Sequence, residues 1–426
     1  MKFLRRLTEA FLLLFVFLLP WQTKLILRPD TNAFTEISLY ASHLVLLLAL
    51  ICFFAYQLIR RDDERKTPPI WYFLAILEIA ILISFFFAPD TLLAAHHYFI
   101  FLGGLGLFYL LREGMNHVAY QESCLNRTRA LYVFLSSIFL HASLGVWQFL
   151  SQKTFASKYL GIASHDPEML GTSVVETVTG RWLRAYGGLD HPNILGGVLV
   201  FALLFSAFLL ARKKIINSQI HVWGILLLFL SYFVSLAALF FSFSRASWLA
   251  YVVGMICLLI VIIKNEDRWV LTRFLAVSFF SVVLFILAVF PYRELVFTRL
   301  DAATRLEKAS LVERIDYLSD AEAMIKKNPL FGIGTGNYVR ETVLNGRPNN
   351  YLNQPVHNAF ILAFAESGVF AFLGLILFLS FLARDSRKQS FSLAVVVAMV
   401  ILMMFDHWLL SLPFGILFFF FILGLI

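Results

Sequence analysis

The sequence predicts an all-α integral membrane protein that crosses the bilayer many times. Of its 426 residues, 60% are hydrophobic and only 15% are charged, against about 25% charged residues in a typical soluble domain. Apolar runs such as 37–59 and 270–290 are long enough to cross about 30 Å of hydrocarbon as helices. We therefore expect a polytopic protein whose helices pack against one another and against lipid.

The apolar runs divide the chain into about twelve membrane-spanning helices. Their expected ranges are 10–27, 37–59, 70–88, 93–111, 130–150, 193–210, 221–241, 246–263, 270–290, 358–382, 391–409 and 413–426. The first range follows Lys2, Arg5 and Arg6, as in a signal peptide. No small-residue cleavage site follows it, so we expect an uncleaved first helix.

Basic residues indicate how the helices are oriented. They gather at the N-terminus and in every second short loop, for example at Arg212, Lys213 and Lys214. With a cytoplasmic N-terminus, every short loop obeys the positive-inside rule. We expect a multi-pass protein of the bacterial inner membrane whose working face is the outer one, which is the periplasmic face in a Gram-negative cell.

Two long loops on the expected outer face organise a single membrane domain, residues 1–426. The first long loop is 151–191 and the second is 291–357. The chain has no repeat and no flexible linker that would divide it further. The two loops are therefore the expected place for function.

The second long loop is predicted to contain an amphipathic surface helix at about 310–327. Ser310 and Glu313 have the spacing of a capping box, and Pro329 disfavours helical geometry at Asn328. The apolar positions follow helical spacing; they are Leu311, Ile315, Leu318, Met324 and Ile325. We expect this stripe to lie on the membrane surface or on the ends of the spans.

The formal net charge of +8 does not indicate a nucleic-acid partner. The basic residues are scattered at helix ends, without a basic–aromatic motif for RNA or DNA. Cys52, Cys124 and Cys257 lack ligand spacing, so we expect neither a disulfide nor a zinc site. The outer loops contain no DxD motif, which argues against a metal-dependent sugar-nucleotide transferase.

Arginines at the ends of spans are the first candidate site residues. Arg245 ends the string SFSR in a very short turn between two spans. An arginine in this position can extend to lipid headgroups, but a guanidinium fixed by a tight turn also suits bidentate phosphate binding. Arg181 and Arg184 precede YGGLDHPN, in which Pro192 fits a first helical turn. That junction is either an ordinary loop-to-helix connection or an anion site at a helix N-terminus.

A second group of candidates surrounds the start of the tenth span. His357 can take or give a proton near neutral pH, or it can form a helix cap together with Asn358. Glu366 lies inside the same apolar run, where we favour a structural bond to loop backbone over an ion pair with arginine. The string GIGTGN lacks the GK[ST] of a P-loop, so we interpret it as a tight turn.

Four strings in the second half of the chain carry a resemblance to a known family. They are RAYGGLDHPN (184–193), SFSRASWLA (242–250), NPLFGIGTGNY (328–338) and HNAFILAFAESGVFAFLG (357–374). In this order, and with a long loop before the last string, they resemble the O-antigen ligase/polymerase superfamily. Members of this superfamily handle glycans linked to polyprenyl pyrophosphate. The first half of the chain resembles the family only in hydropathy.

The resemblance implies a GT-C-like fold and an inverting glycosyltransferase without metal or other cofactor. The donor would be a glycan on undecaprenyl pyrophosphate, and the acceptor a hydroxyl of lipid A–core, as in an O-antigen ligase. By match to the family's motifs, Arg184 and Arg245 would bind the pyrophosphate and His357 would be catalytic. Arg314 is a weaker match to a basic residue of the loop helix. The supporting residues would be Asn358, Arg181, His191 and Glu366.

Three other hypotheses remain open at this point. A polymerase of the same superfamily would use another lipid-linked repeat unit as its acceptor, and the sequence does not separate it from a ligase. A flippase or secondary transporter should carry ionisable residues near mid-membrane in repeated, discontinuous spans, whereas the polar motifs here gather at one face. Transfer to a protein acceptor is the third.

Overall fold

The computed structural model describes the chain except for residues 61–67, 116–124, 213–221, 302–303, 351 and 386–390. The basic residues Lys213 and Lys214, used above for orientation, and the thiol of Cys124 lie outside the described residues. Cys52 and Cys257 are both free thiols.

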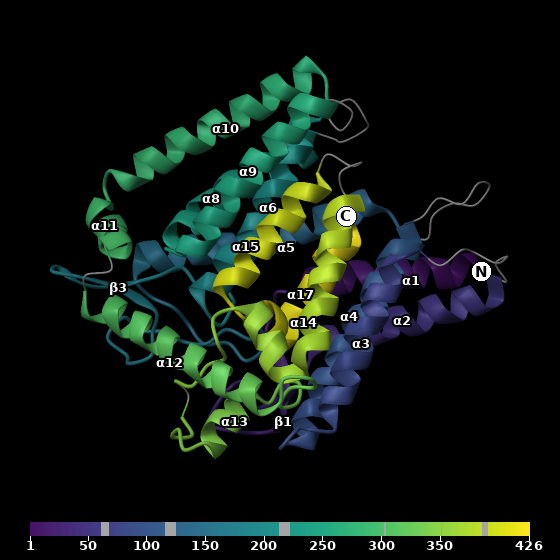
Figure 1. The fold of residues 1–426 in the computed structure, drawn as a ribbon. Coiled ribbons are helices and arrows are strands. Elements are labelled where there is room, and N and C mark those ends of the chain that lie inside the picture. The colour runs from purple at the N-terminus through teal and green to yellow at the C-terminus, as the bar shows by residue number, and fades with distance from the viewer. Residues whose placement is uncertain (61–67, 116–124, 213–221, 302–303, 351, 386–390) are drawn as a thin grey trace.

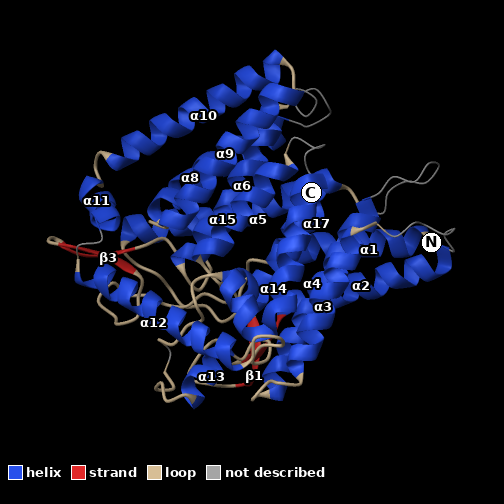
Figure 2. Ribbon diagram, in the orientation of Figure 1, coloured by secondary structure: helices blue, strands red, loops and turns tan. Residues whose placement is uncertain are grey.

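The described chain is mainly helical, with two short antiparallel hairpins (Figures 1 and 2). The elements are α1 (Lys2–Leu18), β1 (Lys24–Arg28), β2 (Ile37–Tyr40), α2 (Ala41–Arg60), α3 (Ile70–Phe85), α4 (Thr91–Met115), α5 (Arg127–Ser151), β3 (Val174–Thr177), β4 (Gly180–Leu183), α6 (Pro192–Ala211), α8 (Val222–Phe241), α9 (Arg245–Asn265), α10 (Arg268–Val289), α11 (Arg293–Asp301), α12 (Arg305–Lys327), α13 (Tyr338–Leu344), α14 (Ala359–Asp385), α15 (Ser392–Phe405), α16 (Trp408–Ser411) and α17 (Pro413–Leu425).

Within the described residues, eight helices are long and apolar enough to cross a membrane: α2, α4, α5, α6, α8, α9, α10 and α14. The helices α3, α15 and α17 are apolar but shorter. The predicted class, a mostly helical polytopic membrane protein, is confirmed. The expected number of about twelve spans stays a prediction.

The first two predicted spans are wrong at the ends that face each other. Helix α1 stops at Leu18, because Pro20 disfavours a helical conformation in the residue before it. Residues 24–28, expected inside the first span, form β1 and pair antiparallel with β2, which holds the first residues of the second predicted span. The apolar side chains of Leu25, Ile26 and Leu27 gave this hairpin the hydropathy of a span.

The loop helix is also longer than predicted. It begins at Arg305, after Thr304, so the expected capping box at Ser310 and Glu313 lies inside the helix and is wrong. Residues 305–309 are mostly good helix formers, which extends the helix toward the N-terminus. The predicted end at Asn328 is confirmed, because Asn328 is the C-cap residue.

The apolar side chains of α12 lie on more than one face. Tyr317, Ala321 and Met324 are buried in a small core against α14. Leu311 and Ile315 remain 45% and 67% exposed. Figure 1 shows α12 and α13 together across one end of the helical bundle. Part of the predicted stripe therefore anchors α12, and part is free to contact lipid.

Helix α6 occupies the centre of the bundle and fixes the place of the site. In its first turns, a Cβ on Gly196 would lie 2.6 Å from Ser247 Oγ, and one on Gly197 would lie 2.7 Å from the Trp408 ring. Small residues let helices approach closely in membrane proteins. The two glycines thus bring the starts of α6 and α9 and the segment after α15 to one place.

Candidate functional site

The turn between α8 and α9 fixes the direction of Arg245. Phe243 has a positive φ of 47°, which is uncommon for a bulky residue. Ser244 follows as the N-cap of α9, where its side chain accepts a hydrogen bond from the Ser247 amide. Arg245 is therefore the first residue of α9, and its guanidinium lies at the end of the bundle. The predicted tight turn is confirmed.

A buried carboxylate holds Arg245 to the second long loop. Glu307 Oε2 of α12 lies 3.2 Å from Arg245 Nη2, and the other oxygen of Glu307 forms an ion pair with Arg299 of α11. Arg245 Nη1 also donates to the Arg299 carbonyl oxygen at 2.8 Å. The side chain of Arg245 remains 33% exposed. One glutamate thus links the start of α9 to α11 and α12.

Arg184 is the buried connection between the first long loop and α6. Its Nε, Nη1 and Nη2 donate to Ser242 O, Ser173 Oγ and Asn193 Oδ1, each at 2.7 Å. Only 4% of Arg184 is exposed, and burial lowers its pKa well below the ordinary value. Arg184 therefore positions its neighbours more than it faces solvent.

Asn193 carries this network to Asp406. Its Nδ2 donates to Asp406 Oδ2 at 3.3 Å. His191, predicted near the helix cap, is the N-cap of α6 and accepts from the Asn193 amide at 3.1 Å. Burial and the charge of Arg184 lower the pKa of His191 to about 3, so this imidazole is neutral.

The start of α14 places His357 beside Asp406. Asn358 caps the helix, accepting from the amides of Phe360 and Ile361 at 3.0 Å, as the helix-cap interpretation predicted. Its Nδ2 donates to the Met404 carbonyl oxygen at 3.1 Å, which ties the start of α14 to the end of α15. The residue before the cap and the residue after α15 are therefore neighbours.

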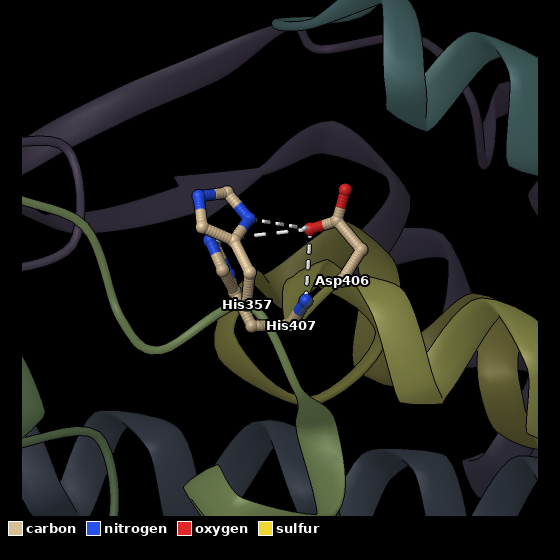
Figure 3. A group of neighbouring side chains, drawn as sticks. All are labelled: His357, Asp406 and His407. Carbon is tan, nitrogen blue, oxygen red and sulfur yellow. Dashed lines mark hydrogen bonds and ion pairs between the residues drawn. The ribbon is translucent and has the colours of Figure 1, made fainter. Parts of the chain in front are cut away.

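His357, Asp406 and His407 form the polar centre of the site (Figure 3). His357 Nδ1 lies 3.8 Å from Asp406 Oδ1 and has no hydrogen-bond partner among the described residues. Asp406 Oδ1 accepts from the His407 amide at 2.8 Å, and His407 Nδ1 lies 2.7 Å from Ser411 Oγ. In Figure 3 both imidazole rings lie beside the same Asp406 oxygen.

The charge of Asp406 follows from its neighbours. Burial alone would raise the pKa of Asp406, but His357, His407 and His191 favour the carboxylate and bring the pKa well below its usual range. Burial lowers the pKa of His407 to about 3, although Asp406 acts in the opposite direction. A charged carboxylate therefore lies between His357 and a neutral His407.

Arg314 and Arg181 occupy different surroundings. Burial lowers the pKa of Arg314, while the nearby charge of Asp406 raises it, so Arg314 of α12 belongs to the same electrostatic environment as the histidines. Arg181 in β4 instead directs Nη1 to the Glu168 carbonyl oxygen, 3.5 Å away. Of the predicted arginines, the structure gathers Arg184, Arg245 and Arg314.

Glu366 supports the glycine-rich turn. Its two carboxylate oxygens accept from the amides of Gly336 and Tyr338 at 2.9 and 3.1 Å. Gly332, Gly334 and Gly336 have φ values of 71°, 102° and 69°, a region that glycine enters without steric cost. The tight turn and the backbone contact of Glu366 agree with the structural interpretation of both.

The histidine cluster also has the composition of a metal site. His357, Asp406 and His407 each offer a ligand atom, and these atoms lie within 4.8 Å of one another. Imidazole and carboxylate are ligands that zinc accepts. Sequence spacing did not indicate this group, because His357 and the Asp406–His407 pair belong to separate helices.

Sequence reasoning also missed several partners of the predicted residues. Asp406 and His407 stood out only as a polar pair near the end of an apolar run. Arg299 and Glu307 lie in a charged loop, where no local pattern distinguishes them from solvent-exposed residues. Asn193 lies within a string that carried the resemblance, but nothing in that string gives it Asp406 as a partner.

The comparison with known families agrees with the second half of the chain. Residues 230–376 match the family model described as O-antigen ligase. The matched range contains Arg245, Glu307, Arg314, His357 and Glu366. No curated protein matches the chain. We conclude that residues 230–376 form a domain of the O-antigen ligase superfamily.

Proposed function

We propose that this protein is an inverting glycosyltransferase of the O-antigen ligase type. It would take a glycan from undecaprenyl pyrophosphate and attach it to a sugar hydroxyl of lipid A–core at the periplasmic face of the inner membrane. The family domain at residues 230–376 supports an enzyme of the ligase/polymerase type. The nature of donor and acceptor is part of the proposal.

One observation carries the proposal: the candidate proton acceptor and the arginines belong to a single site. Asp406 lies 3.8 Å from His357 on one side and accepts from Asn193 on the other, and Asn193 in turn accepts from Arg184. Arg245 and Arg299 share Glu307 at the same end of α9. The group contains more guanidiniums than carboxylates, which favours a bound anion with several negative charges.

The proposed reaction divides the work between these two parts. The acceptor oxygen attacks the anomeric carbon from the face opposite the phosphate, and the bond from that carbon to the phosphate oxygen breaks. The bonding electrons leave with the pyrophosphate, whose growing charge Arg245 and Arg314 would stabilise. His357 would take the proton of the acceptor hydroxyl, and Asp406 would hold the resulting imidazolium. Attack from the opposite face inverts the configuration.

Arg184 has a positioning role in this proposal. Its nitrogens are committed to Ser242, Ser173 and Asn193, so it sets the geometry of the α8–α9 turn and of Asn193. Its charge still contributes to the field at the site. This differs from the direct contact with pyrophosphate that the resemblance implied, and the distinction is testable.

The test is a transfer assay with purified protein in detergent. Lipid-linked glycan is supplied with and without lipid A–core, and the products are separated by size. Product that requires core supports the ligase. Lengthened lipid-linked chains without core support the polymerase, for which the same site would serve. Translocation of the donor without any new glycosidic bond would favour the flippase and overturn the proposal.

A further inference from the structure

An apolar groove opens between α8, α9 and α10, on a part of the fold that the proposed reaction does not use. Its volume is about 340 Å³, within the range of roughly 300–1,000 Å³ typical of small-molecule sites. Figure 1 shows α10 standing apart from α8 and α9 along this region. Among its lining residues, Ile256 and Ile286 are 50% and 62% exposed. The groove is therefore open along the side of the helices.

The inner wall of the groove is held in place by hydrogen bonds. Tyr232 of α8 bonds to Tyr251 of α9 at 2.8 Å and to Ser281 of α10 at 2.5 Å. Tyr251 and Ser281 both line the groove. Buried hydroxyls that satisfy one another across three helices keep these helices in register, so the groove has a defined shape.

One end of the groove lies beside the proposed pyrophosphate site. Trp248 lines the groove and follows Arg245 by one turn of α9. Its Nε1 donates to the Leu239 carbonyl oxygen at 2.9 Å, and its ring stacks on Phe240 at 5.9 Å, which fixes the indole. From Trp248 to Leu259 the wall rises on the order of 16 Å along α9, about half of the hydrocarbon thickness.

We propose that this groove binds the isoprenoid chain of a polyprenyl diphosphate whose head group lies at Arg245. The inference rests on the proposed function and deepens it by assigning the place of the lipid tail. A cation at one end and an apolar channel running away from it complement the two parts of such a ligand. Arg245 keeps a third of its side chain exposed for this purpose.

The energetics predict what the groove contributes. A lipid tail gains little hydrophobic free energy on leaving the bilayer, because the surrounding lipid is equally apolar. Binding of the tail therefore depends on packing against the groove wall, while the head group supplies the electrostatic part. The groove should discriminate by the shape of the chain, with an effect on affinity of about tenfold, which corresponds to about 1.4 kcal/mol.

The test compares two neighbouring residues of α10 with equal exposure. Ile286 lines the groove and Leu287 does not, and both are 62% exposed. Ile286→Trp should weaken binding of undecaprenyl diphosphate about tenfold, measured by native mass spectrometry, and leave binding of inorganic pyrophosphate unchanged. Leu287→Trp should change neither. Equal effects of both substitutions, or no binding of undecaprenyl diphosphate to the unmodified protein, would overturn the inference.

A second measurement does not depend on the tolerance of these substitutions. A photoreactive side chain at Ser278, which also lines the groove, should capture undecaprenyl diphosphate when irradiated. Capture of a bilayer phospholipid that excess undecaprenyl diphosphate does not displace would overturn the inference and make the groove a general lipid site. Failure of the proposed function is distinct, because it appears as absent glycan transfer while these binding results stand.

Discussion

Glu307 of α12 holds Arg245 of α9 in an ion pair of 3.2 Å, and the same carboxylate binds Arg299 of α11. Glu307 is only 4% exposed. The contact fastens the second long loop to the turn that presents Arg245. It also leaves Arg245 partly neutralised, so the position of α12 and the electrostatics of the site depend on one side chain.

Glu307→Ala should destabilise the protein strongly. The substitution leaves Arg299, whose side chain is 12% exposed, without its counter-charge in a buried place. Breaking a buried pair by removing one partner typically costs about 3–5 kcal/mol. The measurement is the thermal unfolding midpoint in detergent.

Glu322→Ala is the matched control, since Glu322 belongs to the same helix and pairs with Lys326 in solvent. This pair is exposed, so its removal should change the unfolding midpoint little. If the two substitutions lower the midpoint equally, Glu307 does not fasten α12.

Arg245→Ala should reduce glycan transfer by about 10²–10³-fold, the usual effect of removing one donor that stabilises developing charge. Transfer is measured in the assay described above, at saturating acceptor. Arg384→Ala is the control, because Arg384 is an exposed residue in the last turn of α14. Full activity of Arg245→Ala would remove this residue from the site.

Arg184→Ala tests the difference between contact and positioning. Loss of its three hydrogen bonds should lower the unfolding midpoint together with transfer, because Ser173, Ser242 and Asn193 lose their common partner. A drop in transfer with an unchanged midpoint would instead favour direct contact with the pyrophosphate.

Asp406→Asn should slow transfer and move its acidic limb to lower pH. The amide keeps an oxygen near His357 but removes the negative charge that stabilises the imidazolium, so His357 is protonated less readily. The pKa of Asp406 in the folded protein lies below its ordinary value. Its contribution to stability is therefore complete above about pH 4 and is lost only as pH falls below that. Within the range of an ordinary assay, Asp406 itself should not titrate.

The pH–rate profile and the unfolding midpoint are measured on the same preparations. A profile that keeps its shape at a lower rate would make Asp406 structural. His357→Ala should abolish the acidic limb along with about 10²–10⁴-fold of the rate.

Local chemistry explains which parts of the fold were predictable. Pro329 ended α12, Asn358 capped α14 and His191 capped α6, because each depends on neighbours within a few residues. The start of α12 was wrong because Ser310 offered a cap that the helix did not need. Residues 24–28 were assigned to a span because hydropathy does not distinguish an apolar hairpin from half a helix.

The arrangement of the site depended on tertiary packing. The approach of His357 to Asp406 requires the bond from Asn358 to the end of α15, which no pattern in either segment indicates. Gly196 and Gly197 allow close packing around α6, but their sequence does not say which helix approaches. The residues with family motifs were predictable, and their partners were not.

Glu366→Gln and Glu366→Ala together test the structural role of this glutamate. Glutamine keeps one oxygen for the amides of Gly336 and Tyr338, whereas alanine leaves both amides without this acceptor. Each unsatisfied buried donor costs about 1–3 kcal/mol. We expect Glu366→Gln to retain most transfer activity and Glu366→Ala to lose stability first. Loss of transfer in Glu366→Gln at an unchanged unfolding midpoint would instead give Glu366 a chemical role.

Chelation decides whether the histidine cluster acts through a metal. If His357 is the proton acceptor, EDTA should leave transfer unchanged, and His407→Gln should keep most of it, because glutamine can still bond to Ser411. If the cluster holds a metal, EDTA should inhibit and zinc should restore activity. His357→Ala and His407→Gln should then be equally damaging, since each removes one of the ligand atoms that lie within 4.8 Å. Metal content measured on the purified protein gives an independent result. We expect the first outcome, because His407 Nδ1 already bonds to Ser411 and Asp406 Oδ2 to Asn193, and these bonds orient the cluster toward His357.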